Sequence, residues 1–446
     1  MVFMDKFLNF CERYQYRIIF SVVVLSFLAS LGHSLYFKIS PAVDADFYDE
    51  MGQELAQGLP YSQGAINRPG PGYEYFLGLV YYLFGYHHLA AWIVQAFLVA
   101  AAAFLVFLTT KLIFKESWHA LMGILAAVLV GFSPDLIVMS SMIMTEVLLV
   151  FLVVVATFFF FKYFDNNKFY FLFLTALFLA LAVLTRGSAL LLLLPMIFYF
   201  IFKKDWHSGL LFVLIFILFM APWTIRNYKI YGQIKPFNSS TGLLYVGNHP
   251  GATGELEPNY PMPEGVNHET MPQLEFDDAL GRAGVKYIKE NPLDFVKLTL
   301  WRTSIFFSVS RPTGFWPYLQ KRPVARFMTL AVSAVYALAV FLFGIVGAIL
   351  SIKKKEGDNR RAKYLLAFLL MVPLSVIALV VETRYRFSIY PFFAIFAGYG
   401  IYRLMIDFKK DYKILIYSSV LLLGNTAFDV LRNFGRILER VGGFFK

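Results

Sequence analysis

The sequence contains little charge and almost no cysteine. Of its 446 residues 15% are charged, whereas ordinary soluble domains carry about 25%. The single cysteine, Cys11, excludes a framework of intramolecular disulfides. The 40 Lys and Arg exceed the 29 Asp and Glu, but they are diluted among apolar runs, which disfavours disorder and nucleic-acid binding. No glycine-rich nucleotide loop follows a strand, and no zinc-type spacing occurs.

Long apolar runs dominate instead, because 59% of the residues are hydrophobic and 18% are aromatic. A membrane-spanning helix needs about 20 mostly apolar residues. The chain is therefore predicted to be an all-α polytopic membrane protein with about 11 transmembrane helices. A shorter apolar stretch, 73–86, is predicted to be a helix at the membrane interface. The predicted spans are 17–37, 88–110, 118–133, 139–161, 169–185, 188–202, 208–225, 327–351, 364–381, 387–405 and 413–430.

Lysines and arginines are concentrated in alternate connections between these spans, beginning with Lys6, Arg13 and Arg17 before the first one. Because basic loops stay in the cytoplasm, the N-terminus is predicted to be cytoplasmic. Two long segments, 38–72 and 227–325, then fall on the extracytoplasmic side.

The second long segment divides into two parts. Residues 237–272 are rich in turn formers and are predicted to be a loop. Residues 273–310 have helical periodicity with a break at Asn291-Pro292. At the end of the chain, 406–446 is expected to hold the last span and a basic amphipathic tail.

Almost all the polar residues at membrane depth fall at the extracytoplasmic ends of the predicted spans. A charge at the bilayer centre costs about 2.5–3.5 kcal/mol on insertion scales, so it persists mainly for function or at a span end. Acids and arginines from distant parts of the chain are therefore expected to converge on one membrane face, where arginines would hold an anionic substrate. The charged candidates are Asp44, Asp46, Glu146, Arg186, Arg226, Glu382, Arg384 and Arg386, with Arg68 as a further phosphate ligand.

The densest acidic cluster begins at Asp44. If the segment is helical, Asp46, Asp49 and Glu50 share a face and Asp44 lies at the helix start. A structural alternative for Asp44 is an N-cap. For Asp49, Glu50 and Glu54 a solvated helix face is the favoured interpretation.

Glu146 is expected inside the fourth span, about one turn below its start. It is a candidate metal ligand, base-orienting group or partner of a phosphate site. The structural alternative is an ion pair with Arg186 or Arg226. Those arginines, like Arg384 and Arg386, could instead be boundary residues that snorkel to the interface.

Four segments carry a resemblance over most of residues 15–405. They are Asp44-x-x-x-Tyr48 continuing to Arg68-Pro69-Gly70-Pro71-Gly72-Tyr73; Ser133-Pro134 with Ser141 and Glu146; Leu184-Thr185-Arg186 with 221–228 and the stretch 247–254 that includes Asn248; and 382–387. In this order they resemble the GT-C superfamily of integral-membrane glycosyltransferases, close to the bacterial protein O-mannosyltransferase and aminoarabinose transferase group. The chain departs from many members in having Asp44-Ala45-Asp46 where they have adjacent Asp-Glu.

The resemblance implies a GT-C-like transmembrane catalytic domain over 1–405, with short interfacial helices in its extracytoplasmic loops. It also implies transfer of a hexosyl or pentosyl unit, with inversion, from a polyprenyl-phosphate carrier. The acceptor would be an envelope lipid, polysaccharide (including lipopolysaccharide) or protein. The reaction would take place at the outer face of the bacterial cytoplasmic (inner) membrane, among membrane lipids.

The resemblance also assigns roles to residues. Asp44 by preference, or Asp46, would accept the proton of the acceptor hydroxyl. The remaining candidates would bind the substrate or its lipid phosphate, and they are Tyr48, Arg68, Glu146, Arg186, Arg226, Asn248, Glu382, Arg384 and Arg386. No cofactor is certain, but a divalent ion held by Asp46 or Glu146 is left open.

The alternative function is a lipid-linked glycan transporter or flippase without transferase activity. Such a protein should place ionisable groups along a path near the midplane, and many transporters contain internal repeats. Here the ionisable groups cluster at one face and no repeat is evident. The transferase is therefore the favoured interpretation.

Overall fold

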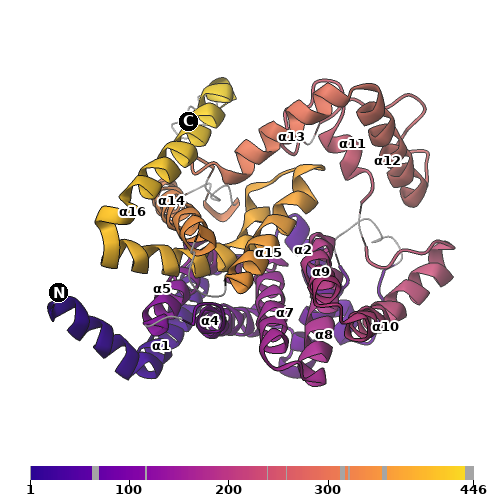
Figure 1. Cartoon of the computed structure of the whole chain (residues 1–446). Helices are drawn as coiled ribbons and strands as arrows, with labels where there is room; N and C mark the ends of the chain where they lie inside the picture. Colours follow the sequence, from indigo (N-terminus) through magenta and orange to yellow (C-terminus); the bar gives the residue numbers. More distant parts are fainter. Residues whose placement is uncertain are drawn as a thin grey trace.

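The computed structural model describes residues 2–62, 70–115, 118–238, 240–257, 259–311, 317–319, 322–353 and 359–436. Within these ranges the chain is a bundle of helices (Figure 1) and forms no strand. Two isolated bridges pair distant segments there, Gly70 with Asn238 and Glu255 with Val381. The predicted all-α membrane class is confirmed.

Six helices in the described ranges are long and apolar enough to cross a membrane. The last of the six is counted together with the 3₁₀ turn 383–389 that precedes it. A bent pair of shorter helices, with an angle of 49° between them, raises the number to seven if the pair forms one broken span. The six are α1 (Val2–Phe37), α4 (His88–Ile113), α7 (Glu146–Asn166), α10 (Trp206–Tyr231), α14 (Pro323–Lys353) and α16 (Tyr390–Arg432); the pair is α5 (His119–Gly131) and α6 (Pro134–Ser140).

A helix lies at every predicted span, but the count of eleven is not confirmed. Three of the predicted spans are shorter or more charged than a spanning helix requires. They are α8 (Phe169–Thr185), the 3₁₀ turn η2 (Gly187–Leu192) with α9 (Leu193–Lys203), and α15 (Arg360–Ile377). The last two predicted spans correspond to the two halves of α16, which are separated by a kink at Asp407, where the backbone is not helical (φ −135°, ψ 47°). No Gly or Pro in 406–412 marks this kink in the sequence.

The remaining elements gather at one end of the bundle, which we call the loop face. Figure 1 shows α11, α12 and α13 grouped there, with the C-terminal half of α16 beside α13. The break predicted at Asn291-Pro292 is confirmed, because one helix ends and the next begins there. These elements are α2 (Asp44–Ala56), α3 (Gly72–Phe84), α11 (Leu243–Gly247), α12 (Gln273–Glu290), α13 (Pro292–Phe307), η3 (Pro317–Leu319) and η4 (Thr383–Ile389).

Glycines allow α16 to approach its neighbours closely. A Cβ atom on Gly347 of α14 would lie 1.8 Å from the Phe396 carbonyl oxygen, and one on Gly398 would lie 2.3 Å from that of Met122 on α5. Helices in membranes associate largely through such close contacts of small residues. The first half of α16 is thereby fixed against α14 and α5, and with it the preceding η4, which carries functional candidates.

Candidate functional site

Arg384 on η4 joins acidic residues from three parts of the chain. Its Nη2 atom donates to Asp44 Oδ2 at 3.0 Å, and its Nε atom donates to Glu382. The same Nε atom lies 3.8 Å from Glu146 Oε1. Asp44 and Arg384 are 340 positions apart in the sequence, and they are in direct contact as expected.

Arg186, at the end of α8, approaches the same carboxylate from the other side. Its Nη1 atom donates to Glu146 Oε1 at 3.0 Å, and its guanidinium lies 4.4 Å from the centroid of the Tyr385 ring. The Glu146 side chain is 2% exposed, and a buried carboxylate persists when such partners compensate its charge. We call Asp44, Glu146, Arg186, Glu382, Arg384 and Tyr385 the ion-pair cluster.

The placement of Glu146 corrects one expectation. It is the first residue of α7 and not a residue one turn inside a span. The predicted span 139–161 runs through a real break, since α6 ends at Ser140 and a turn follows. The residues of that turn, including Met142, Ile143 and Met144, are apolar and buried, so hydropathy does not reveal the break. Of the two structural partners considered, the pair with Arg186 is the one that forms.

Asp44 is the first residue of α2, and the N-cap is Val43. The N-cap interpretation of Asp44 is therefore wrong. The side chain of Asp44 is 35% exposed, so it can meet both Arg384 and solvent. Asp46 is exposed on α2 and makes none of the contacts of the ion-pair cluster. In the described ranges no three His, Cys, Asp or Glu residues lie close enough to hold a metal, and a divalent ion at Asp46 or Glu146 stays an untested prediction.

Asp49 is buried, contrary to the expected solvated face, whereas Glu50 and Glu54 are exposed as expected. The Asp49 carboxylate accepts hydrogen bonds from Tyr81, from Tyr86 at 2.7 Å and from His88 at 3.0 Å. Burial alone would raise the pKa of Asp49, but the hydrogen bonds from His88, Tyr81 and Tyr86 outweigh it and lower the pKa. Asp49 thus braces α2, which carries Asp44, against α3 and the start of α4.

Tyr48 is buried beneath the ion-pair cluster. Its ring centroid lies 5.4 Å from that of Tyr73 on α3. Burial raises the pKa of Tyr48, and the charge of Glu74 raises it further. Asp44 and Glu146 also raise it, which places the hydroxyl within electrostatic range of the cluster.

Glu74 was not among the candidates, although it is fully buried. The Tyr61 hydroxyl donates to Glu74 Oε1 at 3.0 Å, and within the described residues Oε2 has no hydrogen-bond partner. Burial raises the pKa of Glu74 to about 7. The signal was present in the sequence, because Glu74 interrupts the apolar stretch predicted to lie at the interface.

Arg226 and Asn248 also lie outside the ion-pair cluster. Arg226 lies over the Trp223 ring, 4.5 Å from its centroid, and donates to the Tyr61 carbonyl at 2.9 Å. Asn248 accepts from Arg302 at 3.0 Å and donates to the Ala378 carbonyl at 3.2 Å, which ties the large loop to the end of α15. Arg68 falls in the segment 63–69, outside the described residues.

Arg386 is also directed away from the ion-pair cluster, although it is two residues from Arg384. It is fully buried and donates to the Tyr390 hydroxyl at 3.0 Å and to the Ser308 carbonyl at 2.9 Å. The Tyr390 hydroxyl in turn donates to Asp135 on α6 at 2.7 Å. Arg386 therefore anchors η4 in the bundle and is not placed to meet a ligand beside Arg384.

A large cavity opens beside the ion-pair cluster. Its volume is about 920 Å³, and η2, α11, α12 and α15 form its walls. The lining contains six leucines and three valines, among them Leu190, Leu191 and Leu379, and it also includes polar side chains such as Asp278 and Arg282. Arg186 and Tyr385 line both this cavity and a small pocket at Glu146 and Arg384. The cavity thus combines a largely apolar surface with the guanidinium of Arg186, which it shares with the small pocket.

Comparison with known proteins shows a partial sequence match and similar folds. Residues 67–225 match the model of the family described as dolichyl-phosphate-mannose-protein mannosyltransferase. The oligosaccharyltransferase of Archaeoglobus fulgidus, in a complex with zinc and sulfate, superposes with a TM-score of 0.51 at 15% identity, over 92% of this chain and 52% of that chain. Its complex with an inhibitory peptide and a dolichol-phosphate gives 0.51 at 14% identity, over 94% and 56%.

The chain has the GT-C fold. ArnT from Cupriavidus metallidurans, bound to undecaprenyl phosphate, is also similar, with a TM-score of 0.48 at 14% identity over 96% of this chain and 73% of that chain. The chain spans about half the length of the oligosaccharyltransferase chains it matches. No curated protein matches the sequence. The resemblance to GT-C enzymes stated from the motifs is thus confirmed at the level of the fold.

Proposed function

We propose that this GT-C protein is a glycosyltransferase that moves a hexosyl or pentosyl unit from a polyprenyl-phosphate carrier to an envelope acceptor. The reaction takes place at the loop face, which we assign to the outer face of a bacterial inner membrane. The observation that carries the proposal is the ion-pair cluster at the end of an apolar cavity. The similar oligosaccharyltransferase has been solved with a dolichol-phosphate, a ligand of the same class.

The cavity and the arginines fit the two halves of such a donor. An isoprenoid chain is apolar and suits the leucine-rich walls, and the volume of about 920 Å³ is typical of a large ligand site. A phosphate is bound well by planar guanidinium groups, which offer parallel donors. Arg186 belongs to both the cavity and the small pocket of Arg384, so a lipid phosphate would reach both arginines with its chain in the cavity.

Donor binding also changes the partners of Asp44. In this structure the two guanidinium groups of Arg186 and Arg384 face three carboxylates, those of Glu146, Asp44 and Glu382. A phosphate at Arg384 competes with the Asp44 carboxylate, which is partly exposed and has solvent on one side. Glu146 is buried between the arginines and keeps them in place. The exchange would therefore release Asp44 at the moment when the donor is bound.

The released carboxylate is the base of the reaction. It accepts the proton of the acceptor hydroxyl, and the acceptor oxygen forms a bond to the anomeric carbon as the bond from that carbon to the phosphate oxygen breaks. The electron pair leaves with the lipid phosphate, whose charge is stabilised by Arg186 and Arg384. Attack opposite to the leaving group inverts the anomeric centre.

Purified protein in lipid vesicles tests this proposal. With a polyprenyl-phosphate sugar and an envelope extract, we expect labelled sugar in the acceptor fraction and an equal amount of free polyprenyl phosphate. Mass spectrometry of envelope glycans from cells with and without the protein identifies the product. Movement of the lipid-linked sugar between leaflets with no release of free carrier would contradict the proposal and favour a flippase.

A further inference from the structure

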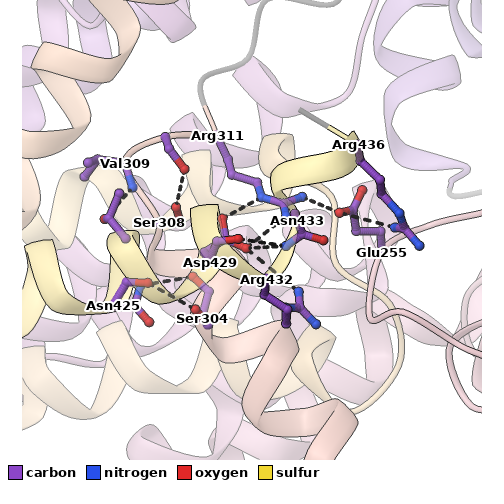
Figure 2. A network of polar contacts seen from close by, with 12 residues as sticks. Glu255, Ser304, Ser308, Val309, Arg311, Asn425, Asp429, Arg432, Asn433 and Arg436 are labelled. Atoms are coloured by element: carbon purple, nitrogen blue, oxygen red, sulfur yellow. Dashed lines mark hydrogen bonds and ion pairs between the residues drawn. The ribbon is translucent and has the colours of Figure 1, made fainter. Parts of the chain in front are cut away.

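A second polar network joins the C-terminal half of α16 to the chain that follows α13 (Figure 2). Arg311 donates from Nε to Asp429 Oδ2 at 2.7 Å and from Nη2 to Oδ1 at 2.9 Å. Its Nη1 atom donates to Glu255 Oε1 at 2.7 Å. We call Glu255, Arg311 and Asp429 the clasp. The Asp429 side chain is 1% exposed, so this two-pronged pair is shielded from water and holds one geometry.

Neighbouring contacts tie the same two segments together. Figure 2 shows Asn425 of α16 donating to the Ser304 carbonyl at 3.1 Å. The backbone of Val309 donates to Thr426 at 3.3 Å. Within α16 and its C-cap, Asn433 donates to Asp429 at 3.0 Å and so supports the acceptor of Arg311. The end of α13 and the residues up to Arg311 therefore lie in a fixed register along α16.

Two contacts connect the clasp to the segment 381–386, which carries Arg384. At one end, the backbone of Glu255 pairs with that of Val381. At the other end, the carbonyl of Ser308, three residues before Arg311, accepts the hydrogen bond from Arg386 at 2.9 Å. The segment is thus held on both sides of Arg384. The stretch that contains Glu255 holds it before Arg384, and the stretch from Ser308 to Arg311 holds it after Arg384. The clasp joins both stretches to α16.

We propose that Arg311 and Asp429 are positioning residues for Arg384. They fix the segment 381–386 and so set where the Arg384 guanidinium meets the phosphate of the donor. The inference rests on the proposed function, because it takes Arg384 as a phosphate ligand. A buried carboxylate that loses its arginine is left uncompensated, so a change at the clasp is expected to displace the backbone that it holds.

Binding of farnesyl phosphate to the purified full chain in detergent tests the role, with farnesol as the uncharged reference. We expect Asp429→Asn and Arg311→Lys each to weaken farnesyl phosphate binding about three- to tenfold and to leave farnesol binding unchanged. In an Arg384→Ala background the same changes should weaken binding no further, because their effect passes through Arg384.

The chain offers a matched control on the same helix. Arg403 donates to Asp411 at 2.8 and 3.1 Å, which is a similar pair in the first half of α16 and its bend. Asp411→Asn should therefore leave farnesyl phosphate affinity at the wild-type value. Thermal unfolding of each variant verifies folding, and Arg311→Lys, which keeps the positive charge, is the milder change if Asp429→Asn does not fold.

The outcomes separate this inference from the function on which it rests. If wild-type protein prefers farnesyl phosphate to farnesol and Arg384→Ala removes the preference, the phosphate site stands. Additive losses in the double variants, or wild-type affinity in Asp429→Asn, would then overturn the positioning role alone. A wild-type protein that does not distinguish the two probes would overturn the phosphate site and the positioning role together.

Discussion

Arg384 donates a 3.0 Å hydrogen bond to Asp44, which precedes it by 340 residues. The contact joins η4 to α2 and places the proposed base in an ion pair. The proposed base and the proposed phosphate ligand are therefore each other's partners in this structure. Any ligand that occupies Arg384 changes the state of Asp44.

Asp44→Asn should lower the transfer rate by about 10²–10⁴-fold, because an amide cannot take up the proton of the acceptor hydroxyl. The measurement is the release of free polyprenyl phosphate by membranes that contain equal amounts of inserted protein. Asp46→Asn is the matched control, since Asp46 is exposed and outside the ion-pair cluster, and it should retain nearly full activity. A fully active Asp44→Asn protein would remove Asp44 from the mechanism.

Glu146→Gln should lower the stability of the protein by about 3 kcal/mol, since it leaves Arg186 and Arg384 facing each other without the carboxylate between them. Thermal unfolding in detergent measures the loss. Adding Arg186→Gln should recover part of it, because the double variant no longer holds the second guanidinium. If the stability lost by the double variant equals the sum of the losses of the two single variants, the two side chains do not interact.

Glu74→Gln should change how stability depends on pH. The pKa of Glu74 is raised from 4.5 to about 7 in the folded protein, so the wild type binds this proton more tightly when folded. The stability that this tighter proton binding gives the folded wild type is fully present below about pH 4.5 and is lost as the pH rises through about 7. The difference in pKa corresponds to about 3 kcal/mol.

The glutamine variant does not ionise and still offers Tyr61 an acceptor. Its unfolding free energy relative to the wild type should therefore increase by about 3 kcal/mol between pH 4.5 and pH 8. Unfolding midpoints at the two pH values measure this change. Glu54→Gln, at an exposed position of α2, is the control. A constant difference between Glu74→Gln and the wild type would contradict the assignment.

Leu191→Trp should fill part of the apolar cavity and reduce the affinity for a long-chain polyprenyl phosphate more than for a short-chain one. Leu191 lines the cavity, whereas Leu194, one turn further along, does not and is 40% exposed. Leu194→Trp is therefore the control with the same added volume. Competition between labelled long and short lipids measures both affinities. Equal effects of the two tryptophans would exclude the cavity as the site of the chain.

The helices were predictable where charge or turn residues bound an apolar run. Residues 169–185 form α8 as predicted because Lys168 and Arg186 flank an uninterrupted apolar stretch. The break between α12 and α13 was visible because proline cannot continue a preceding helix. The turn after α6 was not visible, since its residues are as apolar as the helices on either side.

The partners of the polar residues depended on tertiary structure. Arg186 and Arg226 each follow an apolar run that was predicted as a span. In the structure Arg186 follows α8 and meets Glu146, whereas Arg226 lies inside α10 and over Trp223. Asp49 looked solvated because its three donors lie 32 to 39 residues away. Spacing along one helix identifies a face, but not what a different helix brings to it.

The surplus of carboxylates in the ion-pair cluster, three against two guanidinium groups, has a consequence for ligand selectivity. A small anion such as sulfate can bind Arg384 only by breaking the ion pair between Arg384 and Asp44. Its own charge is all that offsets the free energy lost with that ion pair. A polyprenyl phosphate also gains free energy from burying its chain in the cavity, by about 25 cal/mol per Å² of apolar surface. Under the proposed function, these ion pairs would therefore act as a barrier to free anions, and inorganic phosphate should inhibit transfer only weakly.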